Sequence, residues 1–241
     1  MLFRSYDFTQ ERPNVEFDND GERHILWPEN EFRLARFPGG AHDLVLLSGV
    51  EPHLRYATYA DAIIRVAQEL RCEMVVTLGA APEACPHTRP APVVGSSTTD
   101  GLVDALALSR PRYQGVTGLV GVLQQRLDAA GIPAVSLRVG VPYYLGNAKH
   151  PASSASLLQH LEHVLGVPTA AASLGDDIER WRSLHDEAVA DDPQAAEYVV
   201  MLEAEYDRQI DAQVASADTL AADLERFLRE QRPDADDGTG G

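Results

Sequence analysis

Val75-Val-Thr-Leu-Gly-Ala80, which runs on to Pro86-His-Thr-Arg-Pro90, is the stretch of this sequence that decides the fold. It begins as an apolar run and breaks into glycine, proline and polar residues, as happens where a buried parallel strand ends in a loop. Leu47-Ser-Gly-Val-Glu-Pro-His53 and Tyr113-Gln-Gly-Val-Thr-Gly-Leu-Val-Gly121 follow the same pattern. Ligands bind at that end of the strands in open α/β sheets, so these loops are where a site is expected.

The sequence around these loops alternates between helix spacing and strand spacing. Apolar residues three and four apart predict helices over 56–70 and 119–130, and continuous apolar runs predict strands at 44–47, 74–78 and 132–139. Residues 14–37 alternate with period two around Asp18-Asn-Asp-Gly21, which predicts short strands and a turn. The whole order predicts an α/β fold with a largely parallel sheet.

The C-terminal part has only helix spacing. We expect helices from Pro151 to Leu165, from a capping pair of Ser173 and Asp176, from Asp192-Pro193, and over 217–231. Residues 232–241 are polar and rich in glycine, which predicts a disordered tail. The predicted division is therefore an α/β core domain over 1–168, an acidic helical extension packed on it over 169–231, and the tail.

Composition narrows the class of protein. A chain of 241 residues that is 44% apolar can bury one real core, and it has no apolar stretch of the ~18–20 residues that a membrane span needs. Two cysteines are too few for a disulfide framework, which favours free thiols in a reducing cytoplasm. Residues 151–241 hold 20 of the 37 acidic side chains and 6 of the 20 basic ones. That charge would repel a phosphate backbone, so we expect no nucleic-acid partner and a solvated acidic face.

The first loop offers Gly49, Glu51 and His53 to a crevice at the strand ends. A glycine here is explained by the tight turn between strand and helix, and we favour that interpretation. In the third loop, Thr117 and Gly118 open a helix whose free amides could hold an anion. The loop lacks the lysine and spacing of a P-loop, so close packing of helix on sheet explains its glycines better.

The second loop, with Gly79 before it, is the more informative one. Two prolines stiffen the segment that presents His87, Thr88 and Arg89, which lowers the entropy lost when a ligand binds. As an anion site it would pair Arg89 with an acid or a phosphate. We favour the alternative, in which this loop arginine is tied to a nearby carboxylate or carbonyl of the protein itself.

No other group makes a convincing site. Cys85 lies two residues from His87, but nothing supplies a third group to orient that pair for nucleophilic catalysis. His160, Glu162 and His163 lie on the polar side of a predicted helix, where a solvated surface is favoured over a metal site. We predict no cofactor and no metal.

The three loop phrases, together with Trp27-Pro28 and Val141-Pro-Tyr-Tyr144, resemble the bacterial branch of the proteasome assembly chaperone 2 family over about residues 6–231. The resemblance implies a three-layer fold similar to that of nucleoside phosphorylases and hydrolases. It also implies a non-enzymatic, homo-oligomeric module that binds a protein partner, such as proteasome α-type subunits. The end Asp237-Gly-Thr-Gly-Gly241 lacks the hydrophobic-tyrosine-any-residue terminus by which some relatives are thought to dock on proteasome rings.

The sequence departs from the family at its start, because the family's first strand, loop and helix have no counterpart here. We expect either that the true start lies upstream of Met1, or that this form is compromised or is completed by a partner, and we favour a misassigned start or a fragment. The alternative function is a nucleosidase-like or phosphorylase-like hydrolase in the same crevice. Its acid, base and anion-binding groups would have to be Glu51, His87 and Arg89.

Overall fold

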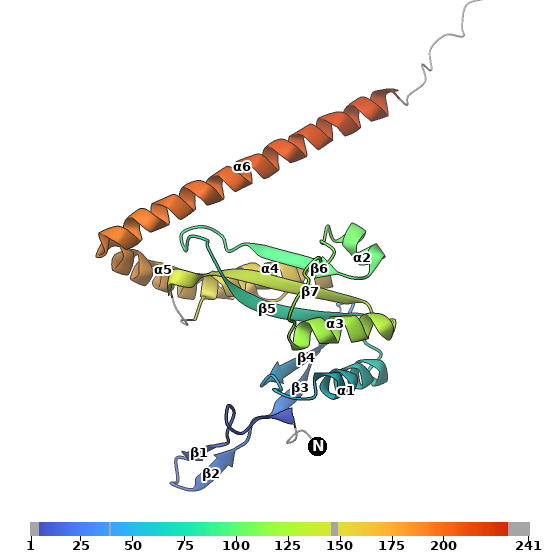
Figure 1. Ribbon diagram of the computed structural model, residues 1–241, viewed down its shortest axis with the longest axis vertical. Helices are drawn as coiled ribbons and strands as arrows, with labels where there is room; N and C mark the ends of the chain where they lie inside the picture. Colours follow the sequence, from blue (N-terminus) through green and yellow to red (C-terminus); the bar gives the residue numbers. More distant parts are fainter. Residues whose placement is uncertain (1–4, 39, 146–148, 231–241) are drawn as a thin grey trace, which may run out of the picture.

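The computed structural model describes residues 5–38, 40–145 and 149–230, the last 18 of these as backbone only. The strands are β1 (Asn14–Phe17), β2 (Arg23–Leu26), β3 (Asn30–Ala35), β4 (Leu44–Gly49), β5 (Val75–Glu83), β6 (Val93–Ser97) and β7 (Ala134–Pro142). The helices are α1 (Tyr56–Glu69), α2 (Asp100–Ala105), α3 (Leu119–Ala129), α4 (Pro151–Leu165), α5 (Gly175–Ala190) and α6 (Pro193–Glu230). Figure 1 shows that α6 projects well beyond the α/β body.

The strands do not form the largely parallel sheet that the sequence predicts. They form two antiparallel pairs, β1–β2 and β3–β4, and a three-stranded sheet in the order β5–β7–β6. Among the described strands only β5 and β7 pair in parallel, while β6 is antiparallel to β7. The prediction was wrong because a parallel return needs a crossover of a dozen or more residues, and the loop from β5 to β6 has nine.

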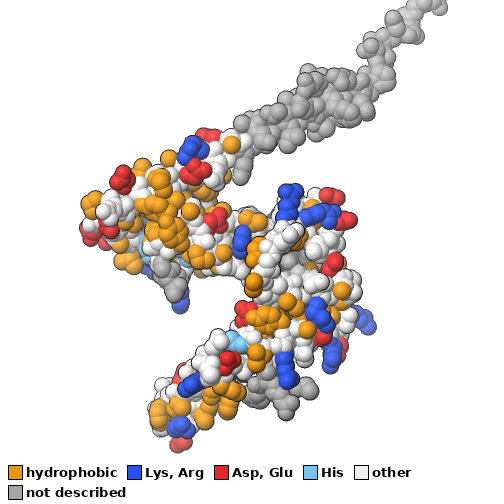
Figure 2. Space-filling model, viewed as in Figure 1, with side chains coloured by type: hydrophobic (Ala, Val, Ile, Leu, Met, Phe, Trp, Pro, Cys, Tyr) orange, Lys and Arg blue, Asp and Glu red, His pale blue; other side chains and the backbone are white. Residues whose placement is uncertain are grey.

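The hairpin β1–β2 follows the prediction for residues 14–37. The Asp18 side chain accepts hydrogen bonds from the amides of Asp20 (3.0 Å) and Glu22 (2.8 Å), and Gly21 has a φ of +80°. The hairpin stands away from the body and carries apolar side chains into solvent (Figures 1 and 2). Phe17 is 67% exposed, and the register partners Val15 and Ile25 are about half exposed.

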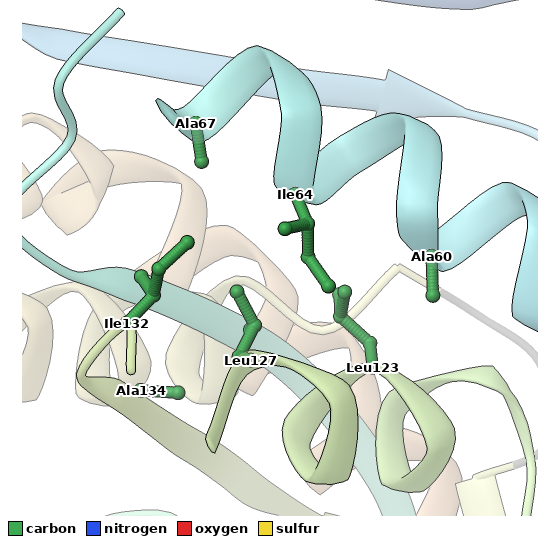
Figure 3. Close-up of a cluster of buried hydrophobic side chains, with 7 residues drawn as sticks. All are labelled: Ala60, Ile64, Ala67, Leu123, Leu127, Ile132 and Ala134. Atoms are coloured by element: carbon green, nitrogen blue, oxygen red, sulfur yellow. The ribbon is translucent and has the colours of Figure 1, made fainter. Parts of the chain in front are cut away.

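The core lies in two clusters on opposite faces of β7. On one face Ala60, Ile64 and Ala67 of α1 pack against α3 and the start of β7 (Figure 3). Their partners on that face are Leu123, Leu127, Ile132 and Ala134. On the other face Val135 and Leu137 pack against Leu161 of α4. Successive residues of a strand point to opposite faces, so β7 is the middle of three layers.

The helices of the C-terminal part are fewer and longer than predicted. Residues 171–174 form a 3-10 turn, and α5 begins at Gly175 without a side-chain cap, so the predicted capping pair of Ser173 and Asp176 was wrong. The Asp192 carboxylate does cap α6, accepting from the Gln194 amide at 2.9 Å. The predicted third and fourth helices are one continuous helix. The predicted tail, 232–241, lies outside the described residues.

Within the described chain, no helix combines the length and the apolar character needed to cross a bilayer.

Replacing Leu127 with alanine should lower the free energy of unfolding by about 2–5 kcal/mol, because this side chain is fully buried between α1 and α3. Urea denaturation followed by circular dichroism measures the change. Leu184→Ala is the matched control, since Leu184 is 65% exposed and should change stability by no more than about 0.5 kcal/mol. Equal losses in the two variants would contradict the assignment of this core.

Candidate functional site

A groove of about 460 Å³ opens between the β3–β4 pair and the three-stranded sheet. Residues of β3, β4, α1, β5 and α3 line it, and Gly49 and Glu51 lie at one end. Several of its apolar lining residues are also exposed, among them Leu46 and Leu78 at nearly half of their surface. Of the predicted crevice residues, the groove therefore contains Gly49 and Glu51 of the first loop, but not His53.

Gly49 is required where it stands. Its φ is +157°, and a Cβ there would collide with the Asn30 side chain and the Glu29 carbonyl of the neighbouring strand. The freed space lets the Asn30 amide group hydrogen-bond to Tyr6 and accept from Tyr59 Oη at 2.7 Å. These bonds tie the N-terminal segment and α1 to the end of β4, so the glycine serves the fold rather than a ligand.

Glu51 closes the end of the groove nearest α3. Its Oε1 accepts a hydrogen bond from the Leu119 amide (3.3 Å), at the N-terminus of α3 that begins after Thr117 and Gly118. An anion bound there would have to displace a carboxylate that already interacts with the positive end of the helix dipole. The structure thus favours the packing interpretation of this loop over an anion site.

His53 and Gly79 have local roles or none. The His53 backbone amide donates to the Ser5 carbonyl at 2.9 Å, and its Nδ1 accepts from the Asp7 amide at 3.3 Å. Its ring also packs edge-on against Tyr6. A Cβ added at Gly79 would meet nothing within 4 Å, so neither backbone shape nor close packing demands glycine there.

His87 lies in a different network, between the loop after β5 and α5. The imidazole is 1% exposed; its Nδ1 lies 2.6 Å from Tyr144 Oη and its Nε2 lies 3.1 Å from Asp186 Oδ1. The His87 amide donates to the same tyrosine oxygen (2.9 Å), so the tyrosine hydroxyl is free to donate to Nδ1, and Nε2–H donates to Asp186. Burial lowers the pKa of His87, and the Asp186 carboxylate partly offsets that effect.

Thr88 and Arg89 bind α6. The Arg89 guanidinium makes two parallel hydrogen bonds to the Asp207 carboxylate, at 3.0 and 2.9 Å, and a third to Glu203 at 3.1 Å. The Thr88 hydroxyl donates to the same Glu203. Arg89 holds the pKa of the Asp207 carboxyl below its usual range. The arginine is thus tied to carboxylates of its own chain, which is the alternative that the sequence favoured.

Sequence reasoning missed the partners of this second network. Asp186, Glu203 and Asp207 were counted only as part of a solvated acidic face. The spacing of four between Glu203 and Asp207 places both on one side of a helix, which was the available signal. Nothing in the sequence indicated that this side faces Arg89, because the partners are 114 and 118 residues apart.

A histidine and aromatic cluster joins α4 to α5 beside His87. The His150 ring lies 4.1 Å from that of Trp181, which in turn lies 4.2 Å from that of His185. His150 Nδ1 accepts from the Ser153 amide at 3.0 Å and so caps α4. Burial, with the nearby His185 and His87, lowers the pKa of His150 from 6.5 to about 4. The cap therefore depends on a neutral imidazole.

The remaining candidates do not assemble into a site. Burial raises the pKa of the Cys85 thiol to about 11, which suppresses the thiolate that a nucleophile needs. Glu162 accepts from the Thr169 amide at 2.7 Å, and His160 Nδ1 lies 2.8 Å from the Ser156 carbonyl. Among the described residues no group of three or more metal-ligating side chains could hold a metal ion.

Glu51 and the loop of His87 to Arg89 thus belong to separate networks. In the described part of the chain no hydrogen bond or ion pair joins Glu51 to His87 or Arg89, and only Glu51 lines the groove. The sequence predicts that these strand ends form one crevice. In the structure an open groove lies beside β4, whereas the loop after β5 is bound to α5 and α6.

A comparison with protein-family models matches residues 3–189 to the PAC2 family. Among solved structures, a PAC2 family protein from Streptomyces avermitilis is 37% identical, with a TM-score of 0.75 over 83% of this chain and 84% of that one. A proteasome-assembly chaperone homologue from Mycobacterium tuberculosis is 36% identical, with a TM-score of 0.72 over 81% and 83%. A Mycobacterium tuberculosis protein of unknown function is 28% identical, with a TM-score of 0.76 over 88% and 73%. The curated proteins give no match.

Replacing Arg89 with alanine should loosen α6, because it removes the three hydrogen bonds that hold Glu203 and Asp207. We expect several-fold faster cleavage by chymotrypsin after Tyr206, measured by mass spectrometry of timed digests. Arg208→Ala is the control, since the contacts of Arg208, with Glu205 and the Ala204 carbonyl, lie within the same helix. Equal cleavage rates in the two variants would mean that Arg89 does not secure the helix.

Acidification below pH 6.5 should destabilise the protein through His150. Its folded pKa of about 4 lies below the unfolded value of 6.5, so the unfolded state binds more protons and the stabilisation is lost as the pH falls from 6.5 towards 4. His150→Asn keeps a cap for α4 and removes the titration, so its unfolding free energy should fall less over that range. The pKa of His87 is also lowered, so the unfolding free energy of the variant should still fall somewhat with pH. Urea titrations at pH 7, 6, 5 and 4.5 measure the unfolding free energy of both proteins. An equal fall of that free energy with pH in the two proteins would exclude this role for His150.

Proposed function

Because this chain belongs to the PAC2 family, we propose that it is a non-enzymatic protein-binding module that acts as a homo-oligomer in the cytoplasm, as a proteasome assembly chaperone. One observation carries the proposal: a proteasome-assembly chaperone homologue is 36% identical over more than four fifths of both chains. The expected partners are proteasome α-type subunits. The expected likeness to nucleoside phosphorylases stays a prediction.

The surface supports a binding role. Large apolar side chains are exposed on and near the β1–β2 hairpin, where Figure 2 shows several groups of them among charged side chains. Phe8, Val15, Phe17, Ile25 and Leu34 are each 44–67% exposed. Exposed apolar patches of this kind mark interaction surfaces in soluble proteins. An isolated two-stranded hairpin is itself only marginally stable, so a partner that covers it would also stabilise it.

The division into domains fits the same proposal. We treat 1–168 as the core that carries the binding surfaces, and 169–231 as the extension that Arg89 and His87 fasten to it. The enzyme alternative gains no support, because Arg89 is bound to two carboxylates and Glu51 is bound to the Leu119 amide. We therefore do not propose it.

Size-exclusion chromatography with light scattering tests the proposal on the protein alone and mixed with the host's proteasome α subunits. We expect a defined homo-oligomer alone and a stable complex in the mixture. Val15→Thr with Ile25→Thr should weaken these associations at least tenfold, because it removes apolar surface from the hairpin and keeps the branched side chains that suit strands.

Val116→Thr is the matched control, because Val116 is 93% exposed in a loop away from the hairpin. A homo-oligomer that ignores the α subunits would contradict the proteasome role. A monomer would contradict the proposed homo-oligomer. An unchanged complex in the hairpin variant would mean that the hairpin is not the binding surface.

A further inference from the structure

Helix α6 extends past the surface on which it packs. Glu203 and Asp207, four residues apart, bind Arg89 and so mark the side of the helix that faces the body. On that side Val199 is buried, whereas Ile210 is already 40% exposed. Figure 1 shows the rest of the helix running away from the body. About half of α6 therefore lies beyond the surface that holds its first half.

The second half of α6 has the residue spacing of a coiled coil. From position 210 onward, apolar residues recur at alternating steps of four and three, which is the heptad repeat of helices that wrap around each other. These residues are Ile210, Val214, Ala217, Ala221, Leu224 and Leu228. The backbone is helical over this whole range, so the six positions share one side of α6. Two steps earlier, the same repeat passes through Asp207 and Glu203, the residues that bind Arg89.

This side of the helix needs a partner beyond the body. In proteins, most of the stability of a helix comes from the packing of its apolar side rather than from intrinsic propensity. Among the hydrogen bonds of the described residues, those from Arg89 to Asp207 are the last that join α6 to the body. A second helix with the same repeat would supply the packing that the body supplies to the first half.

The charges beside the repeat favour a second copy of this helix in parallel orientation. With Val214 and Ala221 at heptad position a, the three e positions are all acidic and the three g positions carry no charge. The e residues are Asp211, Asp218 and Glu225, and the g residues are Gln213, Leu220 and Phe227. In an antiparallel pair e faces e, so carboxylates would repel each other. In a parallel pair e faces g, where the same sequence places no like charge.

We propose that the second halves of α6 from different copies of this chain associate as a parallel, in-register coiled coil over residues 210–228. The inference rests on the homo-oligomer of the proposed function and names one contact of that oligomer in addition to the β1–β2 hairpin. Figure 1 shows this part of α6 and the hairpin at opposite ends of the molecule. The two contacts can therefore be tested independently.

Cysteine cross-linking of the full chain tests the orientation. Leu224→Cys places a thiol at position d, where two parallel copies meet at the same residue. In an antiparallel pair centred on the same segment, the two thiols would lie ~15 Å apart along the helix axis. Cys72→Ser removes the more accessible native thiol, and Cys85 is buried. We expect disulfide-linked dimers after mild oxidation with copper phenanthroline, measured by non-reducing electrophoresis.

The matched control for cross-linking is Thr219→Cys in the same Cys72→Ser chain. Position 219 is an f position, on the opposite side of the helix from the repeat, and it should give at least tenfold less dimer. Leu224→Glu should weaken the association of the chain with itself at least tenfold in a dilution series followed by light scattering, because it places a carboxylate between the copies. Thr219→Glu adds the same charge to the same helix and should leave the association unchanged.

Two results would overturn the inference. An oligomer that forms equal amounts of cross-linked dimer through Leu224→Cys and Thr219→Cys, and that Leu224→Glu leaves intact, would exclude this contact and leave the homo-oligomer standing. A monomer would exclude both. Cross-linking through Leu224→Cys without a complex in the mixture with α subunits would support the coiled coil and contradict the proteasome role, so the two failures are distinguishable.

Discussion

The packing of α1 on α3 is the contact on which the rest of this structure depends. β4 and β5 share no hydrogen-bond ladder, so the described backbone pairing does not fix the β3–β4 pair against the three-stranded sheet. Leu127, with no exposed surface, and Ile64 across from it do so instead. Side-chain packing at interior density resists a change of even one methylene, so a helix pair can hold two sheets apart as firmly as a shared strand would hold them together. The groove is a consequence of that arrangement.

A second constraint fastens the C-terminal helices. α6 carries much of the acidic excess, which by itself would repel the helix from the neighbouring helix α5, which is also acidic. Arg89 offsets this repulsion with two hydrogen bonds to Asp207 and one to Glu203. The bidentate geometry also fixes the orientation of the helix, which a lysine at this position would not do. The stiff loop between two prolines therefore serves to present Arg89 to the chain's own carboxylates.

Local pattern was enough for the parts of the fold that depend on neighbouring residues. The three- and four-residue spacing located α1 and α3, and Asp18 to Gly21 located the hairpin turn. Pairing between distant strands was not predictable in this way. The direction of β6 follows from the length of one loop, and the helix break expected near residue 216 is absent because no residue there interrupts the backbone bonds of α6. The role of Arg89 depended on residues 114 and 118 positions away, so the sequence favoured an internal partner over an anion site but could not identify that partner.

The family resemblance and the geometry answer different questions. Likeness at 36–37% identity over most of the chain supports a binding role, but a fold accommodates many functions, and a site must be argued from its own residues. The loop of Glu51 and the loop of His87 to Arg89, which the sequence predicts as one crevice, belong to separate networks. The side chains of His87, Thr88 and Arg89 already bind groups of the same chain, whereas β4 and β5 each have one edge without a strand partner among the described strands. The exposed apolar side chains on the β1–β2 hairpin support the proposed protein-binding role.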